Sequence, residues 1–202
     1  MSTGTILAIV IPAAVVILLI AVAVVLDRRR RGRLREQFGP EYDRAVEEAG
    51  GRRAAERDLE EREKRHASLD LTPLSSGVKE RYAREWRGVQ EEFVDRPRDA
   101  VRDADVLVTS LMHDRGYPTE NYEQRLRDLS VEHGRTLENY RAAHEIKTRS
   151  TSEDEGVTTE ELRGAMVLYR VLFDDLLTDG SGDAGRPGEP PGPDRPPGSD
   201  RP

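Results

Sequence analysis

The apolar residues of the first 26 positions are arranged differently from those of the rest of the chain. Residues 6–26 form a run of 21 residues without a charged side chain, made of Ile, Leu, Val and Ala apart from Pro12. A helix of this length reaches ~31 Å, which matches the ~30 Å hydrocarbon core of a bilayer. The pattern predicts a transmembrane helix over 6–26, preceded by a short extracytoplasmic N-terminus over 1–5.

The sequence that follows this run is strongly basic. The leader has no charged side chain and the apolar run is longer than that of a cleaved signal peptide, which favours a retained, single-pass signal-anchor. Positive charge after the span places the N-terminus outside and the C-terminal domain in the cytoplasm, at the inner (plasma) membrane. Residues 27–35 are predicted to be a basic juxtamembrane collar that contacts anionic lipid headgroups. Its six arginines are Arg28, Arg29, Arg30, Arg31, Arg33 and Arg35.

Charged residues dominate the next segment, 36–71. Helix-forming residues with opposite charges at i,i+4 spacing fill 52–67, and Gly50-Gly51 precede them. We expect a short helix, a glycine hinge and a charged stalk helix, whose sparse apolar stripe could dock on the next domain. The apolar a and d positions that a coiled-coil dimer requires are absent.

A helical spacing of apolar residues marks residues 72–177. Four long stripes run from Val78 to Phe93, Ala100 to Met112, Leu137 to Ile146 and Leu162 to Leu176. Asn121 and Thr158 each open a capping-box pattern, and a polar loop is expected from Lys147 to Gly156. The fold class predicted is therefore all-α: a transmembrane helix, a stalk, a bundle of four to five helices over 72–177, and a tail.

Residues 178–202 are rich in proline and glycine. Six Gly and seven Pro in 25 positions predict a disordered tail. The prolines at 187, 190, 193 and 196 keep a P-x-x-P spacing, which a polyproline-binding partner could recognise. The alternative is a flexible segment of biased composition.

The net charge of −7 is unevenly distributed along the chain. The collar carries +5 and the tail −2, which leaves −10 for residues 36–177. An acidic domain is repelled by nucleic acid, so no nucleic-acid partner is expected. The chain has no cysteine, which excludes disulfides and thiolate chemistry.

Catalytic, cofactor and metal motifs are not found in the sequence. The four histidines form no i,i+4 pair, and no phosphate-binding glycine loop or nucleophile motif is present. Four residues remain as possible partner or pocket residues: Trp86, Tyr117, Tyr140 and His144. For each, burial in the core or under a turn is the competing interpretation.

Several short motifs resemble a family of uncharacterised bacterial single-pass membrane proteins from GC-rich genomes, with a helical cytoplasmic domain. They are F-G-P-E-Y-D over 38–43, W-R-G-V-Q-E-E-F-V-D over 86–95, Ala104-Asp105, R-G-Y-P over 115–118 and D-L-S-V over 128–131. The resemblance implies the same topology and no catalytic activity.

These patterns together favour a membrane-anchored, non-enzymatic helical module that binds or scaffolds an unknown protein partner, with its oligomeric state left open. The alternative is a small-ligand sensor or an enzyme that uses a cleft in the bundle. The structural evidence for this alternative would be a concave pocket in which Tyr140 and His144 lie close to Asp105 or Asp128.

Overall fold

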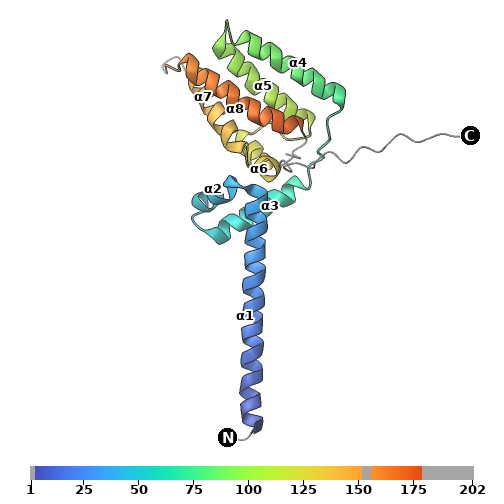
Figure 1. The fold of residues 1–202 in the computed structure, drawn as a ribbon, viewed down its shortest axis with the longest axis vertical. Coiled ribbons are helices and arrows are strands. Elements are labelled where there is room, and N and C mark those ends of the chain that lie inside the picture. Colours follow the sequence, from blue (N-terminus) through green and yellow to red (C-terminus); the bar gives the residue numbers. More distant parts are fainter. Residues whose placement is uncertain (1–2, 152–155, 179–202) are drawn as a thin grey trace, which may run out of the picture.

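The computed structural model describes residues 3–151 and 156–178, with side chains from residue 15 onward. Eight helices and no strand occur in this part of the chain, which confirms the all-α prediction (Figure 1). Their bounds are α1 Thr3–Phe38, α2 Pro40–Glu48, α3 Arg52–His66, α4 Ser76–Glu92, α5 Pro97–Asp114, α6 Tyr122–His133, α7 Leu137–Thr151 and α8 Thr159–Leu177. The predicted tail falls outside the described residues from 179 onward.

Helix α1 is a single long helix that projects from the other helices (Figure 1). Among the residues whose side chains are described, no helix is both long and apolar enough to cross a membrane. This finding contradicts the predicted transmembrane helix, the single-pass signal-anchor and the placement in the inner membrane with a cytoplasmic domain.

The C-terminal end of α1 packs into a small core of its own. Leu34 and Phe38 of α1 are fully buried there. The other members come from α2, α3 and α6, and they are Tyr42, Ala45, Ala55, Leu59 and Val131. The sparse apolar stripe of α3 is therefore docked against α6, and the segment 36–59 is part of a packed unit.

A close backbone approach fixes this unit to the bundle at Gly134. A Cβ atom on Gly134 would lie 2.5 Å from the carbonyl oxygen of Phe38 and 2.9 Å from that of Ser130. Only a residue without a side chain permits the end of α1 to lie this close to the corner between α6 and α7.

The larger core lies between α4, α5, α7 and α8, with α6 at its edge (Figure 1). The apolar stripes predicted from the sequence supply its buried residues, including Trp86, Leu111, Tyr140 and Phe173, each fully buried. Burial of large apolar side chains along a helix face, at about 1.5–3 kcal/mol each, is what holds such a bundle together.

The helix boundaries follow local signals in the sequence. Thr158 and Glu161 form the predicted capping box at the start of α8. The Asn121 side chain accepts a hydrogen bond from the Gln124 amide, 3.0 Å away, at the start of α6. Helix α7 continues to Thr151, so the loop that we expected from Lys147 begins later. A tertiary contact accounts for the longer helix, because Lys147 lies 3.2 Å from the buried carboxylate of Asp105.

Candidate functional site

The basic collar is the C-terminal part of α1. Arg28 and Arg29 are exposed. The other four arginines lie close to carboxylates of the same chain: Arg30 to Glu60 at 2.5 Å, Arg31 to Asp27 at 2.8 Å, Arg33 to Glu63 at 3.1 Å and Arg35 to Asp43 at 2.9 Å. Much of the positive charge of the collar is thus offset by α2, α3 and α1 itself. Contact with lipid headgroups stays a prediction.

Two of the predicted site residues, Tyr140 and His144, lie on α7 beside Asp105 of α5. The Tyr169 hydroxyl donates a hydrogen bond of 3.0 Å to Asp105 Oδ1, and His144 Nδ1 lies 3.3 Å from the same oxygen. Burial raises the pKa of Asp105, but the hydrogen bond from His144 and the charge of Lys147 lower it more, so the net pKa falls below its usual range. The carboxylate is therefore kept ionised among its own partners.

Aromatic side chains close this cluster from the other side. The Tyr122 ring stacks on the His144 ring, with centroids 4.1 Å apart and planes 16° from parallel. The buried Tyr140 hydroxyl accepts a hydrogen bond of 2.9 Å from Arg125. Its residues thus use their polar atoms on one another. Of them, Tyr122 also lines a hollow around Arg141, and none lines a second hollow around Trp86. This arrangement stabilises the bundle.

Tyr117 is also buried, with 2 % of its surface exposed, at the junction between the two cores. Its hydroxyl donates to Glu132 at 3.1 Å, and its ring lies 6.2 Å from that of His133. His133 Nδ1 in turn lies 2.8 Å from Asp175 Oδ2 of α8. Tyr117 is therefore packed under the turn after α5 and is not available as an exposed recognition residue.

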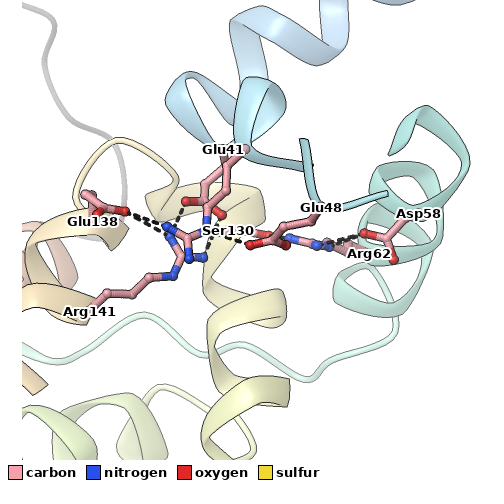
Figure 2. A network of polar contacts seen from close by, with 8 residues as sticks. Glu41, Glu48, Asp58, Arg62, Ser130, Glu138 and Arg141 are labelled. Atoms are coloured by element: carbon pink, nitrogen blue, oxygen red, sulfur yellow. Dashed lines mark hydrogen bonds and ion pairs between the residues drawn. The ribbon is translucent and has the colours of Figure 1, made fainter. Parts of the chain in front are cut away.

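A network of arginines and carboxylates joins α2 and α3 to α6 and α7 (Figure 2). Arg141 of α7 holds both carboxylate oxygens of the buried Glu41 of α2, one of them at 2.8 Å. Arg62 of α3 bonds Asp58 through Nε at 2.8 Å and the Ser130 hydroxyl of α6 at 3.3 Å. The hollow beside it has a volume of about 310 Å³ and a mixed-charge lining. Since its arginines already have carboxylate partners, the network serves to lock the two parts of the chain together.

The most apolar hollow is a groove between α4 and α8, which we call the α4/α8 groove. It has a volume of about 340 Å³ and is lined by nine residues: Trp86, Gln90, Phe93, Arg163, Met166, Val167, Arg170, Val171 and Asp174. Val167 is 60 % exposed and Val171 38 %, while Trp86 is fully buried. The groove therefore has an aromatic floor and an exposed aliphatic wall.

Arg170 lies over the floor of the α4/α8 groove. Its guanidinium carbon is 5.4 Å from the centroid of the Trp86 ring and 5.7 Å from that of Phe173, and its Nε donates to Asp174 at 2.7 Å. The Trp86 indole N–H is buried and has no hydrogen-bond acceptor among the described residues. Buried indole N–H groups usually have an acceptor, so this donor is unsatisfied.

The sequence analysis identified Trp86 but missed the α8 side of the groove. A signal was present: Val167 and Val171 are apolar, spaced i,i+4, and lie off the stripe that packs into the core. An apolar pair outside the buried stripe of an amphipathic helix indicates a second contact surface.

No group of three or more His, Asp or Glu residues in the described part of the chain is placed to hold a metal ion. Comparisons with protein families, with curated proteins and with solved structures find no match. The function is accordingly argued from the geometry of the α4/α8 groove.

Proposed function

We propose that this chain is a non-enzymatic helical interaction module that binds a protein segment in the α4/α8 groove. The observation that supports the proposal is an exposed aliphatic wall, Val167 and Val171, above a floor formed by the only tryptophan. Energetically important residues of protein interfaces are enriched in Trp and Arg, and Trp86 and Arg170 occupy the centre of this groove.

The size and lining of the groove favour a peptide segment as the ligand. Nine residues line it, whereas a stable protein–protein interface uses about 20–30 residues on each side. Short segments that bind in aromatic or aliphatic grooves are a common recognition mode. The polar clusters elsewhere are internally paired, as at Asp105 and Glu41, which supports a structural role for them.

The test compares two valines of almost equal exposure. Val167, in the groove, is 60 % exposed, and Val106, on α5 outside the groove, is 57 % exposed. Proteins that copurify with the full chain are quantified for the unchanged protein, Val167→Asp and Val106→Asp. Any protein lost only with Val167→Asp is then purified and titrated against all three.

We expect the affinity of the chain for this partner protein to fall at least about tenfold with Val167→Asp and to stay within about twofold with Val106→Asp. The reason is that a charge placed in an apolar contact must be desolvated. The proposal is wrong if no copurifying protein distinguishes the two variants, or if the purified protein binds both equally.

A further inference from the structure

We propose that the proline-rich segment 186–197 of this same chain binds in the α4/α8 groove. This inference rests on the proposed function, because it names the first ligand of that groove. The segment 186–197 lies beyond the described residues, which end at Thr178.

The position at which the tail leaves the bundle is the first argument. Helix α8 ends at Leu177, one turn beyond Asp174, which lines the end of the groove. The α8 side of the groove then runs back along the helix to Arg163, a distance of ~16 Å at 1.5 Å per residue. A tail that reverses direction after α8 therefore enters the groove at its near end.

The length of the connecting segment fits this path. Residues 179–185 include Gly180, Gly182 and Gly185, a composition typical of a flexible linker. Seven such residues have a root-mean-square span of ~13–16 Å, which exceeds the single helical turn between the end of α8 and Asp174, so the linker can reach the groove. A flexible linker matched to its span gives an effective concentration in the millimolar range, so even a weak contact is populated.

The chemistry of the segment matches that of the groove. Pro187, Pro190, Pro193 and Pro196 keep the three-residue period of a polyproline II helix, whose backbone carbonyls make no internal hydrogen bonds. Such segments bind in grooves lined by aromatic residues. Shifting Arg170 off the Trp86 ring would let a proline ring take its place.

The order of charges agrees with a tail that runs antiparallel to α8. From the near end of the groove, α8 presents Asp174, Arg170 and Arg163. The tail presents, from its N-terminal side, Arg186 and Glu189, followed by the neutralising pair Asp194 and Arg195. In the antiparallel direction Arg186 followed by Glu189 matches Asp174 followed by Arg170, and the reverse direction would lose this match.

The absence of cysteine from the chain makes a clean trapping experiment possible. One cysteine is placed in the tail by Gly192→Cys, and the second in the groove by Val167→Cys or, as the matched control, on α5 by Val106→Cys. Fourteen residues from 179 to 192 extend to as much as ~50 Å, so both sites are within reach of the tail. A disulfide requires Cα atoms within about 7 Å of each other, so its rate of formation reports how often the tail lies at each site.

The purified full chains are oxidised under identical conditions and resolved by non-reducing electrophoresis and peptide mapping. We expect an intramolecular disulfide between positions 167 and 192 to form at least about tenfold faster than one between positions 106 and 192, in line with the effective concentration of a bound tethered segment. Replacing Pro187, Pro190, Pro193 and Pro196 by glycine is expected to remove this difference.

Equal rates at the two sites, a rate unaffected by the proline replacements, or a product that is a covalent dimer would each overturn the inference. None of these results bears on whether a separate protein binds in the α4/α8 groove, which the Val167→Asp variant tests. The failure of the tail as a ligand is thus distinguishable from the failure of the groove as a binding surface.

Discussion

Glu41→Gln is expected to destabilise the chain by removing the buried charge that joins α2 to α7. The Glu41 side chain is 4 % exposed and that of Arg141 is 16 % exposed. Both oxygens of Glu41 accept hydrogen bonds from Arg141, as Figure 2 shows. Glutamine has nearly the same shape, so the substitution isolates the charge and one of the two hydrogen bonds.

The magnitude follows from the burial of the pair. A hydrogen bond to a charged group contributes about 1.5–3 kcal/mol, and the loss of one partner of a fully buried ion pair costs about 3–5 kcal/mol. Arg141 keeps some exposure and a second carboxylate, Glu138, 3.4 Å away. We therefore expect a loss of about 2 kcal/mol in the free energy of unfolding, which corresponds to roughly 4–8 °C in Tm for a chain of this size.

Urea denaturation followed by circular dichroism measures this loss. The control is Glu48→Gln, because Glu48 is 57 % exposed and its bond to Arg44 is worth about 0.5 kcal/mol or less. Combining Glu41→Gln with Arg141→Gln gives the pairwise coupling, for which we expect at least about 1 kcal/mol. The proposed role of Glu41 in holding α2 against α7 would be refuted by either of two results. One is a loss of unfolding free energy no larger than that of Glu48→Gln, and the other is the absence of coupling energy between Glu41 and Arg141.

Three further changes test other parts of the fold. Gly134→Ala is expected to cost about 2–3 kcal/mol in chemical denaturation, because its Cβ would collide with the carbonyl of Phe38. Gly88→Ala, in open space inside α4, should instead stabilise the chain by about 0.5–1 kcal/mol, and a loss there would contradict the helix assignment. Burial raises the pKa of Asp175, but the hydrogen bonds from His133 and Thr136 and the nearby positive charges together lower it more, to a net value below the ordinary 3.8. The stability that Asp175 contributes is therefore present above pH 3.8 and is lost as the pH falls through its folded-state pKa. In Asp175→Asn the pH dependence of unfolding below pH 3.8 should be shallower, and an unchanged slope would count against the His133–Asp175 pair.

The sequence predicts the helices of the bundle well because each carries an apolar stripe that must be buried. It predicts less about α2 and α3, which bury only a few apolar residues and make their remaining tertiary contacts through charged side chains. Arg62 reaches Ser130, and Arg65 lies 2.9 Å from the buried Asp128, both more than 60 positions away in the sequence. The spacing of alternating charges is the same on a helix that faces solvent and on one that packs against another helix. The packing of α3 against α6 could therefore not be predicted from the spacing.

The α4/α8 groove illustrates a different limit of sequence reasoning. Trp86 was identified from its place in an apolar stripe, and it is buried as that stripe requires. Val167 and Val171 lie more than 80 positions away from Trp86 in the sequence. The three residues line one groove because α4 and α8 pack against the same core. The length of the apolar run at the N-terminus led to the membrane prediction, which is contradicted because no helix in the described part of the chain is long and apolar enough to cross a membrane.

The central claim is that the α4/α8 groove binds a protein segment, and photo-cross-linking in growing cells tests it most directly. A benzophenone amino acid is placed at position 167 in one version of the full chain and at position 106 in another, two sites of 60 % and 57 % exposure. The account predicts products, either with the chain's own tail or with a specific protein, that form at position 167 and not at position 106. Equal products at both positions, or none at position 167, would contradict it.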